Sequence, residues 1–216
     1  MSRVPLSIVI QAGGASRRMG QDKALVPFLG RTLLEYVLDQ IAGFGSETLI
    51  ITNRPETYEK FGVQLRSDVL PGLGALGGLY SAIYHAEHDR CLLLACDMPF
   101  VNRPLLRHMV SLVADHDAVV PRLEPAEFAE PFRAVYRKSC LGPLRTALEA
   151  GERRISSALA GLDIRFVDRV EIDSIDPGAR SFFNINTPED LEEARRLASQ
   201  FAPPPLPGIP LRRTQE

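Results

Sequence analysis

The chain has 216 residues, a length typical of one domain that buries a sizeable core. Hydrophobic residues make up 45% of it and charged residues 24%, with a formal net charge of −2, so composition gives no electrostatic reason to expect nucleic-acid binding. We expect a single domain over residues 1–201. The proline-rich residues 202–216 are expected to form an extended, flexible tail.

Cysteine usage and hydropathy indicate the compartment. Cys91, Cys96 and Cys140 are odd in number and lack zinc-ribbon or CxxC spacing, so we expect reduced core thiols rather than a disulfide framework. The N-terminal residues lead directly into the first predicted strand, which leaves no room for a signal peptide. No run approaches the roughly 18 apolar residues of a membrane span. We therefore expect a cytoplasmic protein without a membrane partner.

Strand-like and helix-like segments alternate along the first half of the chain. Strands are predicted over residues 6–10, 48–52, 63–67, 91–96 and 118–120, and helices over residues 33–41, 55–61, 79–88 and 104–114. A glycine-rich turn over residues 71–78 precedes the third helix. Right-handed crossovers between such units predict an α/β fold: a three-layer, mostly parallel, doubly wound (Rossmann-like) sheet with helices on both faces.

The pattern is less regular beyond residue 120. Residues 123–130 are acidic and loop-like, residues 132–136 are compatible with a strand, and residues 141–150 and 155–162 are expected to form short helices. The last helix is predicted to open at Thr187, a typical N-cap hydroxyl followed by proline and acidic residues. Its apolar face comprises Leu191, Ala194, Leu197, Ala198 and Phe201.

The first predicted strand runs directly into a glycine-rich, cationic loop. Gly13 and Gly14 allow backbone N–H groups to converge on one anion. Three cations follow within seven residues, namely Arg17, Arg18 and Lys23. A solvated basic turn would also place cations here, but the buried strand and paired glycines favour phosphate binding. Because Lys23 is followed by Ala24 rather than a hydroxyl residue, the loop is no Walker A motif.

A second glycine pattern offers an alternative. Gly72, Gly74 and Gly77 match the dinucleotide fingerprint, and Asp97 follows about twenty residues on, as an NAD-binding motif expects. The preceding residues 66–71 are polar and broken by proline, which makes them a poor candidate for the buried strand that must feed the first glycine. An NAD enzyme is therefore the less favoured interpretation.

Two aspartates follow predicted strands. Asp97 comes directly after a buried strand, so its carboxylate should emerge at the carboxyl edge of the sheet, where open α/β folds bind ligands. Mg²⁺ binds such a carboxylate together with phosphate oxygens and waters. Asp68 follows another strand, where it could accept bonds from a base or ribose or could simply belong to a turn.

Three motifs in this order carry a resemblance to a known family. They are Ala12-Gly13-Gly14-Ala15-Ser16-Arg17-Arg18-Met19-Gly20 with Asp22-Lys23, Cys96-Asp97-Met98-Pro99, and Asn184-Ile185-Asn186-Thr187-Pro188-Glu189. Residues 6–201 thereby resemble the molybdenum cofactor guanylyltransferases of the MobA type, within the nucleotidyltransferase superfamily. The resemblance implies transfer of GMP from GTP to molybdopterin cofactor with release of pyrophosphate, which forms the guanine dinucleotide cofactor.

The resemblance also implies roles for particular residues. Lys23, Asp97 and Arg17 would be catalytic, and Asp97 would bind Mg²⁺. The residues that would bind nucleotide or cofactor are Gln11, Ala12, Gly13, Gly14, Arg18, Lys23, Asp68, Gly77, Asp97, Asn184 and Asn186. Asn53 lies near a further family nucleotide contact, and Glu130-Pro131 is expected near the pterin or metal. For the two C-terminal asparagines, loop and helix-cap hydrogen bonding is the structural alternative.

Two positions bear on the nucleotide. Gln11 departs from the family, whose loop usually begins Leu-Ala-Gly-Gly, whereas Gly13 favours the guanine-using branch over cytidylyltransferases, which typically have alanine there. The alternatives are a nucleotidyltransferase that uses CTP or a sugar or polyol phosphate, and a non-catalytic nucleotide-binding subunit. The expected partners are GTP, molybdopterin cofactor and maturation proteins of molybdoenzymes.

Overall fold

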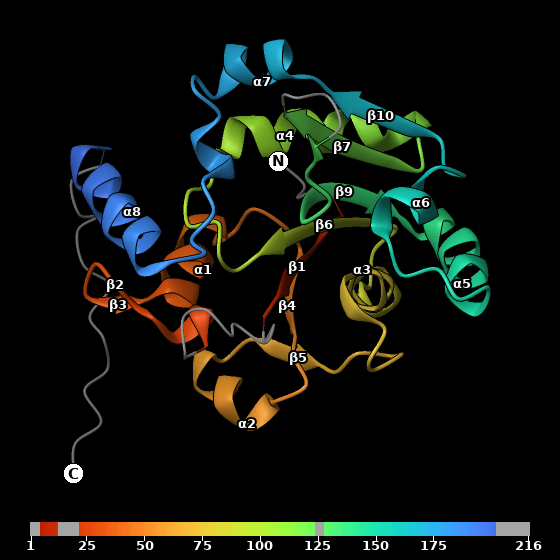
Figure 1. Ribbon diagram of the computed structural model, residues 1–216, viewed down its shortest axis with the longest axis horizontal. Coiled ribbons are helices and arrows are strands. Elements are labelled where there is room, and N and C mark those ends of the chain that lie inside the picture. The colour runs from red at the N-terminus through yellow and green to blue at the C-terminus, as the bar shows by residue number, and fades with distance from the viewer. Residues whose placement is uncertain (1–4, 13–21, 124–127, 202–216) are drawn as a thin grey trace.

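The computed structural model describes residues 5–12, 22–123 and 128–201. An eight-stranded sheet in this part of the chain has the order β10-β7-β9-β6-β1-β4-β5, with β8 paired to the end of β7 (Figure 1). The strands are β1 (Ser7–Gln11), β4 (Glu47–Ile51), β5 (Gln64–Arg66), β6 (Arg90–Ala95), β7 (Ala118–Leu123), β8 (Phe128–Ala129), β9 (Arg133–Arg137) and β10 (Ile164–Val167). The β1–β4, β1–β6, β4–β5 and β7–β10 pairs are parallel, which confirms the predicted mostly parallel sheet.

Helices cover both faces of the sheet, as predicted. They are α1 (Leu33–Ile41), α2 (Pro55–Tyr58), α3 (Gly74–His85), α4 (Arg103–Leu112), α5 (Leu141–Glu149), α6 (Ile155–Leu159), α7 (Arg169–Ile175) and α8 (Pro188–Phe201). In Figure 1, α3, α5 and α6 lie to the right of the sheet and α1 lies to its left. Ile8 and Ile10 of β1 pack with α1 and α4, whereas Val9 packs with α3 and α5. The central strand is therefore apolar at successive positions because both of its faces are buried.

One central strand runs against the others. β9 lies between β6 and β7 and is antiparallel to both, with Arg133 opposite Leu94. The sequence predicted this strand but not its direction, because an apolar run is compatible with parallel and with antiparallel pairing. As a result, β9 begins where β6 ends, and Arg133 enters the sheet beside the segment that leads to Asp97.

The predicted start of the third helix is wrong. The helix was expected over residues 79–88, but α3 runs from Gly74 to His85, so the supposed glycine turn forms its first turns. A Cβ on Gly77 would lie 2.9 Å from the Leu73 Cβ, and one on Gly78 would lie 3.1 Å from the amide atoms of Gln11. The glycines therefore allow close packing within a helix, and this tertiary gain outweighs their low helix propensity.

The second half of the chain contains elements that the sequence did not predict, namely β8, β10 and α7, and the first half adds the hairpin of β2 (Pro27–Phe28) and β3 (Arg31–Thr32). β7 also extends to Leu123, into the expected loop. The loop over residues 13–21 and the expected tail over residues 202–216 lie outside the described residues.

Helix α8 forms a third, smaller core with α1 and the β2–β3 hairpin. Ile185, Leu191 and Ala194 pack with Val26 and Phe28 there. The predicted cap of α8 is confirmed, since the Asp190 N–H donates to Thr187 Oγ1 at 3.2 Å. This packing places the segment before α8 beside the end of β6, as a backbone hydrogen bond from Ile185 N to Asp97 O at 2.9 Å shows.

Other predictions concern the thiols and the membrane. Cys91, Cys96 and Cys140 are buried and unpaired, as expected of reduced core thiols. Among the helices that the structure describes, none has the length and apolar character needed to span a membrane.

Candidate active site

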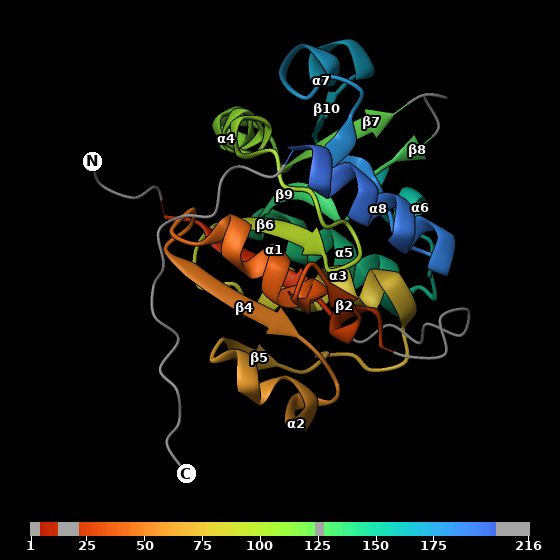
Figure 2. The same ribbon diagram turned by 90° about the vertical axis from the view of Figure 1, so that its left-hand side faces the viewer.

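The candidate site lies at the carboxyl edge of the parallel strands. In Figure 2 the arrows of β4 and β6 point to the same side of the molecule, where α8 also lies. The hydrogen-bond ladder continues past the end of β1, because Ala12 N donates to Ile51 O at 3.0 Å and Cys96 N donates to Gln11 O at 3.4 Å. Gln11, Ala12 and the Cys96-Asp97 segment are therefore fixed side by side at this edge.

Three of the predicted site residues meet through their side chains. Lys23 Nζ donates to Asp97 Oδ2 at 3.0 Å and to Asn186 Oδ1 at 2.8 Å. The side chains of Lys23 and Asp97 are 17% and 21% exposed, so the group is shielded but still open to solvent. Three distant segments of the chain thus supply one cation, one carboxylate and one amide to a single point.

Asp22 holds Lys23 in place. It caps the 3-10 helix Lys23–Leu25, whose Ala24 N–H donates to Asp22 Oδ1 at 3.1 Å. Tyr58 is fully buried and donates its hydroxyl to Asp22 Oδ2 at 2.7 Å, and Arg54 forms an ion pair with the same carboxylate. Burial and the neighbouring Asp22 raise the pKa of Tyr58, which therefore remains a neutral donor. Asp22 therefore fixes the start of the 3-10 helix that carries Lys23, while the Lys23 ammonium faces Asp97 and Asn186.

The segment before α8 is fixed by the first turn of that helix. Asp190 Oδ2 accepts from Asn186 N at 2.8 Å and from Thr187 N at 2.9 Å. These bonds lower the pKa of Asp190, and the bond from Asn186 N has the largest effect. Cap bonding thus uses the backbone of Asn186, while its side chain faces Lys23. Both proposed roles of this asparagine, in the cap and in the site, are compatible.

A second group of predicted residues lies at the end of β5. Asn53 Nδ2 donates to Asp68 Oδ2 at 2.7 Å, and Asp68 N donates to Asn53 Oδ1 at 3.0 Å. The next residue, Val69, donates its N–H to the buried Ser81 Oγ of α3 at 2.9 Å. This reciprocal pair makes Asp68 a rigid feature of the strand end.

Several of the predicted site residues have a buried side-chain oxygen that accepts no hydrogen bond within the described residues. Gln11 Oε1, Asp68 Oδ1 and Asn184 Oδ1 are buried and accept no hydrogen bond in the part of the chain that the structure describes. Leaving such a group unpaired costs about 1–3 kcal/mol, so three of them among the predicted ligand-binding residues favour a bound polar ligand. Arg103 Nε and Ser181 Oγ are the other atoms of this kind among the described residues.

Gly77 has a structural explanation. Its close approach to Leu73 and to the Leu70 carbonyl oxygen requires glycine whether or not a ligand binds there. The Gln11 amide lies against the neighbouring Gly78. The glycine-rich turn of α3 therefore shapes the space around the Gln11 side chain.

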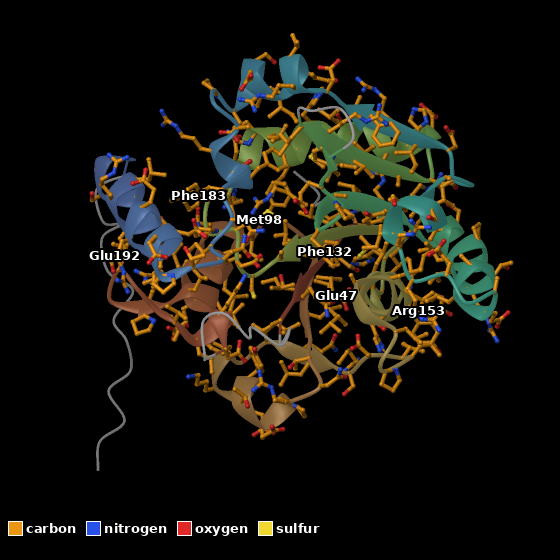
Figure 3. All side chains as sticks on the ribbon, in the orientation of Figure 1. Glu47, Met98, Phe132, Arg153, Phe183 and Glu192 are labelled. Atoms are coloured by element: carbon orange, nitrogen blue, oxygen red, sulfur yellow. The ribbon has the colours of Figure 1, made fainter. Side chains whose placement is uncertain are left out.

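Two residues that support the loop after Asp97 were not predicted from the sequence. Gln40 donates from Nε2 to Pro99 O at 2.5 Å and accepts from Val101 N at 3.0 Å. Arg133 is buried in β9 and bonds to Met98 and Phe100. Figure 3 labels Met98 in this loop and Phe183 in the segment that leads to α8. β9 has an arginine at each end of an apolar run, Arg133 and Arg137, and this pattern was the signal that could have drawn attention to Arg133.

Glu130 is a half-buried acid near the same loop. Its carboxylate accepts from Phe132 N at 3.2 Å. Burial is the main cause that raises its pKa, and the charge of Asp97 adds to this, whereas Arg133 opposes it. A backbone hydrogen bond from Arg133 N to Glu130 O at 3.3 Å places Glu130 next to the residue that contacts the loop after Asp97.

The donor set limits which metal could bind. Within the described ranges, no cluster of three or more His, Cys, Asp or Glu side chains could hold a metal ion. Asp97 is a single carboxylate at an edge that also carries the unpartnered oxygen of Asn184. This fits Mg²⁺, which binds few protein ligands and retains waters and phosphate oxygens. Gly13, Gly14, Arg17 and Arg18 lie outside the described residues.

Two other chemistries find no support. Cys96 is buried beside Asp97, and burial raises the pKa of its thiol, so it is no thiolate nucleophile. The NAD fingerprint would also require a strand that leads directly into Gly72. Here β5 ends at Arg66, and Gly72 lies in the turn that follows, with a φ of +81°. The edge instead combines a cation suited to phosphates, one carboxylate and buried polar acceptors.

Such an edge on a doubly wound sheet is suited to transfer between phosphates, and it defines an α/β nucleotidyltransferase. Residues 8–164 match the MobA-like NTP transferase domain, and the chain belongs to this family. The resemblance stated from the motifs is thereby confirmed, and so is the fold that it implied.

Named relatives agree with this assignment. A "Probable molybdenum cofactor guanylyltransferase" of Peptoclostridium acidaminophilum is 33% identical over 204 residues, which cover 91% of each chain. A protein of the same name from Chloroflexus aggregans is 37% identical over 87% of this chain and 92% of its own. The crystal structure of molybdopterin-guanine dinucleotide biosynthesis protein A from Archaeoglobus fulgidus has a TM-score of 0.78 and 30% identity, over 90% of this chain and all of that one.

Proposed function

We propose that this protein transfers the GMP moiety of GTP to the terminal phosphate of molybdopterin (Mo-molybdopterin) cofactor and releases pyrophosphate. The observation that carries the proposal is the junction of Lys23, Asp97 and Asn186 at the carboxyl edge of the sheet. The names of the relatives support the choice of guanylyl transfer. The product would be a guanine dinucleotide form of the cofactor, which maturation proteins of molybdoenzymes would receive, and the reaction would take place in the cytoplasm.

The chemistry requires no covalent intermediate with the protein. The acceptor phosphate is already ionised and attacks the α-phosphate of GTP directly, so the protein needs to position the reactants and neutralise charge. The Lys23 ammonium would leave Asp97 and donate to the phosphate chain, with Arg17 and Arg18 as further cations. Mg²⁺ bound by Asp97 would supply charge neutralisation at the phosphates.

The buried acceptors would bind the nucleoside and the acceptor molecule. Gln11 Oε1 lies at the end of β1 and would accept a hydrogen bond from a base edge, and the N1–H and N2–H₂ groups of guanine are suitable donors. Asp68 Oδ1 would accept from the ribose or base, on the side of the sheet where Asn53 fixes the carboxylate. Asn184 and Asn186 would contact the pterin side, because they belong to the segment that closes over the end of β6.

Gln11 is also compatible with a second nucleotide, CTP. The N4–H₂ group of cytosine is another donor for the same oxygen, so a related enzyme that uses CTP is the second candidate. Purified protein should release pyrophosphate from GTP only when both Mg²⁺ and molybdopterin cofactor are present. Equal turnover with CTP would show the second candidate to be correct, and turnover driven by a sugar phosphate would replace the acceptor.

A further inference from the structure

Arg133 is a fully buried arginine behind the candidate site. Its side chain is only 1% exposed, in a strand whose neighbours Ala134 and Val135 belong to the apolar core. Placing a guanidinium in such surroundings costs free energy unless its donors are satisfied. The arginine therefore requires a specific explanation.

The guanidinium forms its hydrogen bonds with one short loop and also lies 5.9 Å from the centroid of the Phe182 ring. Its Nη2 donates to Met98 O at 2.9 Å, its Nη1 donates to Phe100 O at 3.0 Å, and its Nε points to Met98 Sδ at 3.4 Å. These three hydrogen-bond acceptors all lie within the three residues that follow Asp97. Figure 3 labels Met98, one partner of Arg133, and Phe132, which precedes Arg133 in the chain. The planar fork thus spans the loop in a way that a single ammonium cannot.

The charge is compensated at longer range. Within the described residues, no carboxylate oxygen forms an ion pair with Arg133. Burial lowers its pKa to about 10, and the charges of Glu130, Asp176 and Asp97 oppose this shift. The side chain is consequently still charged at neutral pH, and carbonyl dipoles are its direct partners.

The loop that Arg133 holds also connects the two halves of the site. Asp97 lies at its start, and the Asp97 carbonyl accepts from Ile185 N at 2.9 Å. The rings of Phe100 and Phe183 are in edge contact at 6.1 Å between centroids. Movement of this loop would therefore shift both the Asp97 carboxylate and the segment that carries Asn184 and Asn186.

We propose that Arg133 is a positioning residue, which fixes the loop after β6 so that the Asp97 carboxylate points at the metal and nucleotide. The inference rests on the proposed function in one respect, namely the assignment of Asp97 as the metal ligand. Core filling alone would not require a guanidinium, because an apolar side chain of similar length would avoid the cost of burying a charge.

The test compares three variants of the full chain. Arg133→Met removes the fork and keeps the length, and Arg133→Lys keeps the charge but not the planar geometry. Arg137→Met is the matched control, because Arg137 lies at the other end of the same strand and bonds to Asp89 and to Ala114 O, away from the loop. Each variant is measured for its unfolding midpoint, for the Kd of Mn²⁺ in the presence of GTP by electron paramagnetic resonance, and for kcat and KM.

A misplaced carboxylate should affect the metal more than the nucleotide. We expect Arg133→Met to weaken Mn²⁺ binding and lower kcat by about 10- to 100-fold, with the KM for GTP nearly unchanged. Arg133→Lys should recover part of the lost Mn²⁺ affinity and kcat. Arg137→Met should match the wild type in Mn²⁺ affinity and in kcat. Unchanged Mn²⁺ affinity in Arg133→Met or Arg133→Lys would overturn the proposal. If Arg133→Met does not fold, the lysine variant alone decides.

The proposed function can fail separately. If the wild type binds Mn²⁺ with GTP but transfers no GMP to molybdopterin cofactor, the reaction assignment is wrong. In that case the Mn²⁺ Kd values of the variants still test Arg133. If Asp97→Asn binds Mn²⁺ as tightly as wild type, the metal ligand itself is misassigned, and the inference on Arg133 fails with it.

Discussion

The ammonium of Lys23 lies 3.0 Å from Oδ2 of Asp97, so that in this structure the lysine neutralises the carboxylate to which we assign the metal. A metal ion bound at this oxygen would compete with the lysine for it. We infer that binding of Mg²⁺ and GTP separates the pair, because the phosphates offer the lysine a new partner. Removal of either charge should therefore be tolerated by the fold more easily than by the reaction.

Substitution Asp97→Asn should abolish most of the activity. Asparagine retains an oxygen that can accept from Lys23, so we expect a small change in the unfolding midpoint, but turnover should fall by about 100-fold or more because charge stabilisation in the transition state is lost. Pyrophosphate release and thermal unfolding measure the two effects. Asp89→Asn, which breaks a surface pair with Arg137, is the control and should leave turnover intact. Wild-type turnover in Asp97→Asn would remove this residue from the metal site.

Gln11→Leu introduces the residue that is usual in the family. It removes the buried, unpartnered Oε1, so the free protein should gain stability. The affinity for GTP should nevertheless fall by roughly 3- to 10-fold, the equivalent of one hydrogen bond. A thermal-shift series with GTP, CTP and ATP in the presence of Mg²⁺ measures both quantities. If GTP stabilises the variant as strongly as the wild type, Gln11 does not contact the base.

Two glycine substitutions form a matched pair. Gly142 lies in α5, and a Cβ added there would meet no atom within 4 Å, so Gly142→Ala should stabilise the protein by about 0.5–1 kcal/mol. Gly78→Ala would place its Cβ 3.1 Å from the Gln11 amide, which must then move. We expect Gly78→Ala to show no such gain in stability and to bind GTP more weakly than the wild type. Denaturant unfolding and nucleotide titration test the pair, and equal behaviour of the two variants would contradict a role for the contact with Gln11.

Glu130 gives a prediction about pH. Its pKa in the folded state is raised above the ordinary value of 4.5, chiefly by burial, so ionised Glu130 destabilises the fold near neutral pH. This cost disappears as the pH falls through the folded-state pKa, because the folded state then binds the proton more readily than the unfolded state. Glu130→Gln should therefore raise the unfolding midpoint at pH 7, and the difference should vanish below pH 4.5.

A control of opposite sign is available. Backbone N–H groups of Arg154 and Arg153 lower the pKa of Glu152, so its charge stabilises the fold above the unfolded-state pKa and this contribution is lost on acidification. Glu152→Gln should therefore lower the midpoint at pH 7. A midpoint for Glu130→Gln that is lower than wild type at pH 7 would show that ionised Glu130 is stabilised by its neighbours after all.

Individual residues show how far the site could be predicted from the sequence. The meeting of Lys23 and Asp97 could be predicted because each follows a strand, and parallel strands end at one edge of the sheet. Asn186 could be placed beside Lys23 and Asp97 only through the family motif. No local pattern in the sequence indicates that the segment before α8 packs against the first loop. The partners of Asn53 and Asp68 depend on strand packing in the same way.

Other features could not be predicted from local patterns. The early start of α3 was missed because Gly74 and Gly77 normally break helices, whereas here tertiary packing selects them. Arg133 was overlooked because an arginine at the end of a strand usually faces solvent, and only the direction of β9 reveals that it faces the loop after Asp97.

The hydrogen bond between Lys23 and Asn186 joins residues 163 positions apart. During synthesis, the strands that form the nucleotide side of the edge emerge from the ribosome long before the segment that precedes α8. Non-local contacts of this kind form late, because the intervening chain must first be ordered. While α8 is still inside the ribosome, the chain would therefore lack the contact between Lys23 and Asn186, and the candidate site would be completed only when α8 docks.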